Sequence, residues 1–408
     1  MRLTSGRFSP SLLAAKFYSR DLRRFVLLLA CVLCCDFASA DSPQHLLLPV
    51  CRDGKWGYVD SAGKMVIEPE FRQAFDFHEG LARVQRGQDT CYIVSSGKVA
   101  FTLPANTVTA ATKFSMGLTS FMTDENRYGY VDRDGRVAIK PQFAEATEFH
   151  EGSAAVCIFE DDKPGRWGYI HPDGSWLLRP QFLHANEFNE GVAVTSVKDK
   201  PFFQFIDSQG ERVFEIEVPM GWYVSQVRGF VEGRASIFYW DGKQSRSGFA
   251  DHAGRMQIMP ATTLYAQLSE GISFERVSGG PLQAVDRAGK VVFKTPFDDA
   301  GKFSEGLCKV QNGEKLAYIG RDGAVRISQV RATNASDAGP REPSDFNDCT
   351  DFHDGIARVH VGGRFDLTCD GPATWQEGTW YYINRAGEIV ALCRHDTDPG
   401  APYGREFH

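Results

Sequence analysis

The sequence has no apolar run long enough to cross a membrane and no strong excess of charge of one sign. Its longest apolar run, Phe25–Cys35, has 11 residues, about half the length of a transmembrane helix. The 45 Lys and Arg residues are nearly balanced by 52 Asp and Glu residues, so no strongly basic surface is expected for a phosphate backbone. We therefore expect no membrane span in the mature protein and no nucleic-acid partner.

Sequence motifs of the common enzyme sites are also missing. There is no G-x-S-x-G nucleophile elbow, no phosphate-binding loop and no dinucleotide-binding glycine pattern. The pairs His78-Glu79 and His150-Glu151 lack the second histidine of a zinc-binding helix. We predict a protein without enzyme activity, cofactor or metal. The chain does contain 40 Gly and 30 Phe residues, a composition that suits β-structure with tight turns.

The first 40 residues have the features of a secretory signal peptide. Arg20, Arg23 and Arg24 precede the apolar run, and the small-residue segment ending at Ala40 suits cleavage. Removing residues 1–40 takes away six positive and two negative charges, which changes the net charge from −7 to −11. We predict a periplasmic or extracellular protein that begins at Asp41. A faint lipoprotein-like box ending at Cys31 leaves lipidation as an alternative.

Ten cysteines are present, and three of them lie in the predicted signal peptide. None of the other seven has the short spacing of a metal site. Their odd number means that at least one does not pair within the chain, and pairing of Cys369 with Cys349 or Cys393 is one possibility. The seven are Cys51, Cys91, Cys157, Cys308, Cys349, Cys369 and Cys393.

An internal repeat dominates the rest of the sequence. Each full copy has an aromatic-Gly-Tyr start, a turn glycine, a Pro-x-Phe segment and a Phe-x-Glu-Gly segment. Weaker copies bring the total to nine, and the last begins at Trp380. The full copies begin at Trp56-Gly57-Tyr58, Tyr128-Gly129-Tyr130 and Trp167-Gly168-Tyr169.

The pattern W-G-Y-[VI]-x-x-x-G…P-x-F-x-x-A-x-x-F-x-E-G resembles the WG-repeat family, which occurs mostly in bacteria. The resemblance covers roughly residues 46–393, although tryptophan is kept at the signature position only in Trp56, Trp167 and Trp380. Members of the family are usually regarded as interaction modules without established catalytic residues. The resemblance therefore implies a binding protein and carries over no active site.

Alternation of residue type with period two predicts three β-strands in each copy. In the first copy these strands lie near residues 56–59, 65–67 and 81–85, and residues 70–78 are expected to be a loop. We predict an all-β fold, a tandem array of about nine three-stranded antiparallel meanders over residues 41–395, followed by a C-terminal tail, 396–408. Nine units exceed the roughly four to eight blades usual in propellers. A curved β-solenoid or toroid is therefore favoured over the propeller-like alternative.

The acidic residues that recur in the repeats are expected to be structural. Each repeated aspartate stands three residues before a turn glycine, where its side chain can cap the turn. The repeated Glu-Gly pair is read in the same way, because a catalytic pair would not recur once per repeat. The aspartates are Asp60, Asp132, Asp207, Asp251 and Asp286; the glutamates are Glu79, Glu151, Glu190, Glu232, Glu270 and Glu305.

Segments that differ between copies are the better candidates for function, since a scaffold repeats and a binding site is unique. Three such segments are residues 218–230, the polar insertion 328–348 and the glycine-rich 362–378. Their aromatic and acidic side chains suit a peptide or carbohydrate, although they could also merely cover an end of the array. The candidate binding residues are Trp222, Tyr223, Phe365, Asp366, Asp370 and Trp375.

We interpret the sequence as an exported, non-catalytic repeat scaffold that binds a protein or peptide partner. A cell-envelope glycan-binding module is the alternative, with Trp222, Tyr223 and Trp375 as sugar contacts. A passive envelope component that only spaces other factors is a third possibility.

Overall fold

The computed structural model describes residues 46–395 apart from 111–112, 198–202, 217–219, 244, 259–261, 265–267, 278–279, 333–339, 341 and 367–373. The described residues form β-strands and turns, without a helix. Accordingly, this part of the chain contains no helix long and apolar enough to cross a membrane.

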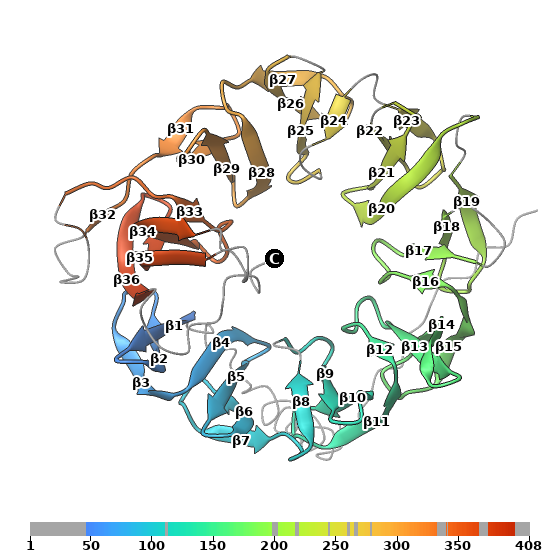
Figure 1. Ribbon diagram of the computed structural model, residues 1–408, viewed down its shortest axis with the longest axis horizontal. Helices are drawn as coiled ribbons and strands as arrows, with labels where there is room; N and C mark the ends of the chain where they lie inside the picture. The colour runs from blue at the N-terminus through green and yellow to red at the C-terminus, as the bar shows by residue number, and fades with distance from the viewer. Residues whose placement is uncertain are drawn as a thin grey trace, which may run out of the picture. The chain divides into compact units, whose positions relative to one another are not determined.

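Nine sheets stand around a ring as the blades of a β-propeller (Figure 1). Consecutive strands of a blade are antiparallel neighbours, with the first strand nearest the centre of the ring (Figure 1). Blades 1 to 3 are β1 (Leu47–Arg52), β2 (Lys55–Asp60), β3 (Met65–Phe71); β4 (Gln73–His78), β5 (Leu81–Arg86), β6 (Asp89–Val94), β7 (Val99–Thr102); and β8 (Thr107–Ala110), β9 (Leu118–Thr123), β10 (Tyr128–Asp132), β11 (Val137–Phe143).

Blades 4 to 6 are β12 (Glu145–Ala146), β13 (Ala154–Glu160), β14 (Lys163–Ile170), β15 (Trp176–Phe182); β16 (His184–Ala185), β17 (Ala193–Ser196), β18 (Phe203–Ile206), β19 (Arg212–Glu215); and β20 (Tyr223–Val231), β21 (Arg234–Trp240), β22 (Ser245–Ala250), β23 (Met256–Ile258). Blades 7 and 8 are β24 (Thr262–Leu264), β25 (Ile272–Val277), β26 (Leu282–Asp286), β27 (Val291–Lys294); and β28 (Asp299–Ser304), β29 (Leu307–Asn312), β30 (Lys315–Gly320), β31 (Val325–Ile327). Blade 9 is β33 (Asp348–Cys349), β34 (Ile356–Asp366), β35 (Thr374–Asn384) and β36 (Glu388–His395), with β32 (Arg331–Ala332) parallel to β36.

The glycine of the repeat signature is required by close contact between two backbones. The pairing register of β2 with β3 shifts between Trp56 and Tyr58, across Gly57, and again between Tyr58 and Val59, as in a β-bulge. A Cβ atom on Gly57 would clash with the Ile67 carbonyl oxygen, and one on Gly168 would lie 2.6 Å from that of Leu178. Any side chain at these positions would therefore push the outer strand away.

Seven of the nine sheets have four strands and blade 9 has five, so the prediction of three strands per unit is wrong. In blade 2 the predicted loop is strand β4, which pairs antiparallel with β5. Glu79 and Gly80 join these strands with φ of 48° and 77°, and two positive φ angles in succession are typical of a tight β-hairpin. The alternation in this segment is disturbed by a register shift between Ala74 and Phe77, which explains why it reads as a loop.

The larger hydrophobic core clusters of the described residues each lie between two neighbouring blades. One cluster, for example, combines Cys51 and Trp56 of blade 1 with Val84 and Ile93 of blade 2. A blade is therefore stabilised by its neighbours and cannot bury its apolar faces alone. The same logic applies to the last blade, whose neighbour is the first.

The array closes on itself as a β-propeller, which confirms the propeller-like alternative; of the two favoured forms, a curved β-solenoid does not close in this way, whereas a toroid does. Blade 9 packs on blade 1 through a buried cluster that includes Leu48, Val50 and Tyr382. The Tyr382 hydroxyl donates a hydrogen bond of 2.9 Å to the Pro49 carbonyl. No local sequence feature specifies this contact, because it depends on the angle accumulated over all nine blades.

Blade 1 differs from the others in having three strands among the described residues. An ion pair connects the blades on its two sides: Arg358 Nη2 of β34 lies 3.3 Å from Asp76 Oδ2 of β4. Burial disfavours the Arg358 charge, yet the negative field of its neighbours, Asp76 among them, keeps its pKa above the ordinary value. Strand β34 of blade 9 and strand β4 of blade 2 are thus linked across blade 1.

Candidate functional site

The repeated aspartates cap turns, as predicted. Asp60 Oδ1 accepts hydrogen bonds of 2.9 Å from the backbone N–H groups of Ala62 and Lys64. Asp132, Asp207, Asp251 and Asp286 accept from the same two positions of their own turns. These carboxylates are therefore occupied by backbone donors, and the fold places them one per blade, which suits neither an acid–base pair nor a shared metal ion.

The residues of the repeat signature are structural. Trp56 is buried, whereas Trp167, Trp380 and Tyr128 are only partly buried against their clusters. Gly129 meets the backbone of the outer strand as Gly57 and Gly168 do. The tyrosines Tyr58, Tyr130 and Tyr169 each donate a hydrogen bond to a backbone carbonyl of the next blade, 17 residues later.

The repeated glutamates have a role that the sequence did not reveal, since each contacts the following blade. Glu151 Oε1 and Oε2 accept hydrogen bonds of 2.7 and 2.8 Å from the backbone N–H groups of Glu190 and Gly191. We call this contact the cross-blade clamp. Equivalent bonds run from the next turn to Glu79, Glu190, Glu232, Glu270 and Glu305.

A cation completes most of these clamps. The cation belongs to the next blade, where it follows the turn-capping position, such as Asp132 or Asp251, between the third and fourth strands. Arg385 Nη2, for example, lies 2.6 Å from Glu305 Oε2, and His252 Nε2 lies 2.9 Å from Glu190 Oε2. The other clamps of this kind are Arg133 with Glu79, Arg287 with Glu232, and Arg321 with Glu270.

Two junctions are exceptions: the Glu151 clamp has Ser208 at the position of the cation, and the junction of blades 3 and 4 lacks both the acid and the cation. Blade 3 has Met116 in place of the glutamate, and its Sδ accepts the Gly152 N–H at 3.1 Å. In blade 4, Pro172 stands at the position of the cation, in the turn between the third and fourth strands. Where the acid is lost the cation is lost too. The sequence held a signal for this pairing, but the two partners are more than 50 residues apart and in different copies.

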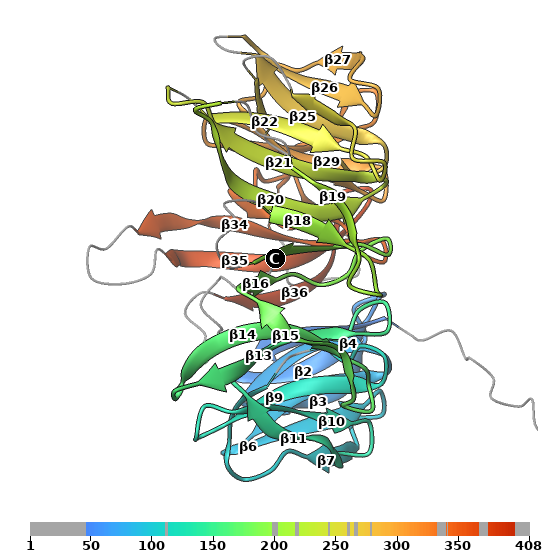
Figure 2. The same cartoon turned by 90° about the vertical axis from the view of Figure 1, so that its right-hand side faces the viewer.

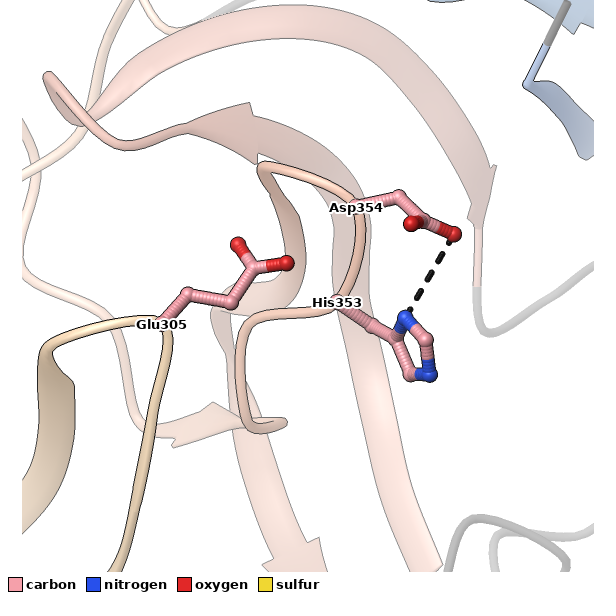
Figure 3. A group of neighbouring side chains, drawn as sticks. All are labelled: Glu305, His353 and Asp354. Carbon is pink, nitrogen blue, oxygen red and sulfur yellow. Dashed lines mark ion pairs between the residues drawn. The ribbon is translucent and has the colours of Figure 1, made fainter. Parts of the chain in front are cut away.

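One group of potential metal ligands occurs in the described part of the chain: Glu305, His353 and Asp354 (Figure 3). Glu305 already accepts hydrogen bonds from Arg385 and from the Gly355 N–H at 2.9 Å. Burial opposes its ionisation, but these donors outweigh the effect and hold the pKa of Glu305 below the ordinary value. Because the positively charged Arg385 guanidinium is bound to Glu305, these three residues would bind a divalent cation poorly.

The two faces of the ring differ in character. The Glu-Gly turns and the Asp-capped turns lie at the same end of the strands, which we call the turn face. The hairpins between second and third strands lie at the other end, which we call the hairpin face. Blade 9 has the longest of these hairpins, with 11 residues in each strand, and it extends beyond the ring (Figure 2).

The predicted binding residues at 222–223 lie at the hairpin-face end of blade 6. The Tyr223 side chain is exposed (58%), and Met220 beside it is fully exposed. Trp222 is partly buried, with its ring 6.1 Å from that of Tyr239 and with the Arg246 guanidinium 5.7 Å from its centroid. Arg246 is in turn held by Asp241 at 2.7 Å. Tyr223 is therefore open to solvent, whereas Trp222 packs against a hydrophobic core cluster.

The remaining predicted residues belong to the blade 9 hairpin. Phe365 and Trp375 are paired in register across β34 and β35, and Asp366 ends β34. Asp370 lies outside the described residues. The structure does not bring the two predicted groups together, because blades 7 and 8 stand between blades 6 and 9.

The cysteines add no site. Six described cysteines are buried thiols, Cys349 and Cys393 among them. Cys369, their suggested disulfide partner, lies outside the described residues. Cys308 and Cys349 belong to different core clusters. Burial raises the pKa of the Cys349 thiol to about 12, which makes it a poor nucleophile at neutral pH.

Comparisons with known proteins agree with the repeat analysis. The family model described as "WG containing repeat" matches residues 56–88, 128–159, 167–200 and 284–315. No curated protein matches the sequence at a significant level. Among solved structures, BamB from Moraxella catarrhalis has a TM-score of 0.41 and 10% identity over 70% of this chain and 92% of its own. Virginiamycin B lyase from Staphylococcus aureus has a TM-score of 0.33 and 12% identity over 68% and 91%. Likenesses at this level carry no argument about function.

Proposed function

Because this chain belongs to the WG-repeat family and its repeats build a nine-bladed propeller, we propose that it is an exported, non-catalytic scaffold. In this proposal it binds a protein or peptide partner through its hairpin face. The observation that supports this most directly is the contrast between the two faces of the ring.

On the turn face, the repeated carboxylates are occupied by turn N–H groups and by cations of the next blade. Such groups hold the ring together and are not available to a ligand. On the hairpin face, blades 6 and 9 depart from the repeat. Exposed Met220 and Tyr223 side chains are the kind of apolar and aromatic contacts that anchor protein interfaces.

A glycan ligand is less well supported than a protein. Sugar rings stack on an open aromatic face, but the Trp222 ring is partly buried and the Arg246 guanidinium lies over it. Tyr223 alone would be a small platform. Binding of an envelope glycan is therefore treated as an outcome of the experiment below.

Export rests on residues 1–40, whose charged, apolar and small-residue regions follow each other in the order of a signal peptide. Cleavage would leave a mature chain with a net charge of −11. Mass spectrometry of the protein recovered from the periplasm or medium tests this, and we expect an N-terminus at Asp41. An N-terminus at Met1 on a cytoplasmic protein would contradict it.

The binding proposal is tested with the exported full chain as bait in an envelope extract, followed by titration with the purified partner. A Met220→Ser/Tyr223→Ala variant should lose one specific partner, with an affinity reduced about tenfold or more. A matched control, Val66→Ser/Val325→Ser, removes exposed apolar side chains of the outer strands and should bind normally. Equal binding by both variants would place the contact elsewhere. If no protein binds, envelope oligosaccharides are tested next.

A further inference from the structure

The cross-blade clamps show what an acidic side chain at the turn position binds in this fold. In six blades the acid accepts backbone N–H groups from a tight turn in the next blade. In five of these it also contacts a cation, four times an arginine and once His252. The molecule thus contains several examples of the same recognition: a carboxylate with a glycine-containing turn and a basic side chain.

The acid of blade 9, Asp354, has the same backbone conformation but neither of these partners. Its φ of 52° matches those of the repeated glutamates, and Gly355 follows it. Blade 1 has no Glu-Gly turn among the described residues. The position that supplies the cation at five other junctions is Ser61. The Asp354 side chain is consequently 67% exposed, against 24% for Glu305 one blade earlier.

His353 next to it is also without its usual contact. The residue before the acid binds a backbone carbonyl of the next blade in blades 3, 4, 7 and 8; His150 Nδ1, for example, lies 2.7 Å from the Phe188 oxygen. His353 is 91% exposed, and its Nδ1 lies 3.4 Å from Oδ2 of Asp354 itself (Figure 3). A carboxylate acceptor and an imidazole therefore stand exposed together at the junction of blades 9 and 1.

We propose that His353 and Asp354 form a recognition site for a basic, glycine-containing turn of a protein partner. Asp354 would accept the turn N–H groups and an arginine guanidinium, and His353 would bind a carbonyl of the partner. Aspartate is one methylene shorter than glutamate, so the turn must approach more closely than in the internal clamps. This site lies on the turn face and does not depend on the partner proposed for the hairpin face.

The probe is a cyclic hairpin peptide with an Asn-Gly turn next to an arginine, compared with a version carrying Gln instead of Arg. The full chain should bind the Arg peptide, and Asp354→Asn should weaken this binding about tenfold, as expected for loss of a charge-assisted contact. Asp162→Asn removes another exposed acid with positive φ and should have no effect. No binding of the Arg peptide, equal binding of the Gln peptide, or equal binding to the Asp354→Asn variant would each overturn the proposal.

A second variant tests whether Asp354 can bind an arginine in the way that the glutamates of the cross-blade clamps do. Ser61→Arg places an arginine where Arg133, Arg287, Arg321 and Arg385 stand in other blades, so it should occupy Asp354 from within the chain. We expect the peptide to bind about tenfold more weakly while the melting temperature stays the same or rises. Unchanged peptide binding would show that Asp354 is not the receptor. The Met220→Ser/Tyr223→Ala variant should keep peptide binding, which separates this site from the hairpin face.

Discussion

The Tyr382 hydroxyl of blade 9 donates a hydrogen bond to the carbonyl oxygen of Pro49, 333 residues earlier in the chain. The hydroxyls of Tyr58, Tyr130 and Tyr169 make the equivalent hydrogen bond to a carbonyl oxygen only 17 residues later in the chain. One repeated side chain thus joins neighbouring blades along the array and also joins its two ends. At the closure the acceptor is in β1, because the described part of blade 1 has no strand nearer the centre.

Replacing Tyr382 with phenylalanine should weaken ring closure. The variant leaves the ring size unchanged but removes one buried hydrogen bond, so we expect the free energy of unfolding to fall by about 1–2 kcal/mol. Hydrogen exchange should become faster in β1 and β36. Tyr169→Phe, which removes the same bond inside the array, is the control, and its effect should stay near blades 4 and 5. Similar exchange of β1 and β36 in both variants would contradict the closing role.

Truncating Trp56 should cost more than replacing it with another ring. Trp56 is 4% exposed, and Trp56→Ala should lower the free energy of unfolding by about 3–5 kcal/mol through the cavity it leaves. Trp56→Phe should cost clearly less, because the indole N–H has no hydrogen-bond partner among the described residues. Urea titration measures both. A loss as large for phenylalanine as for alanine would show that the indole nitrogen has a partner after all.

Restoring the missing acid in blade 3 should stabilise the protein. Met116→Glu would offer a carboxylate to the Gly152 N–H, which now meets a thioether. Hydrogen bonds to charged groups are stronger than those to sulfur, and we expect a gain of about 0.5–1.5 kcal/mol. Met116→Gln, without the charge, should gain less. If the glutamate variant is less stable than the parent, the clamp does not contribute to stability at that junction.

Stability should decrease at mildly acidic pH because of His78. Burial lowers the pKa of His78 below its ordinary value of 6.5, Lys113 and His353 lower it further, and Asp76 opposes them. Because the folded state binds the proton less readily than the unfolded state, its stability falls as the pH drops through about 6.5. Comparing unfolding at pH 7.5 and 5.0 tests this. His78→Gln should reduce the loss, whereas exposed His184→Gln should not; identical profiles for both would exclude His78 as the cause.

The candidate site was only partly predictable from sequence. Divergence from the repeat directed attention to residues 222–223, and the structure places an exposed Tyr223 at the hairpin-face end of blade 6. It could not separate Tyr223 from Trp222, because the burial of Trp222 depends on Tyr239 and Arg246 from other strands. Asp354 was not singled out, because its significance lies in the missing contacts of the next blade.

The sequence by itself determined the repeat unit, its strand and turn positions, and the capping role of Asp60 and its equivalents. These features depend on residues within about 20 positions of each other, so pattern and spacing are enough to specify them. The fourth strand of blade 2 also pairs locally, β4 with β5, but its register shift hides the alternation that would predict it. The tertiary structure decided the clamps between Glu305 and Arg385 or Glu190 and His252, and the closure of Tyr382 on Pro49. Those contacts join residues 60 to 333 positions apart, and they form only because each blade is set at an angle to the next that brings the ninth back to the first.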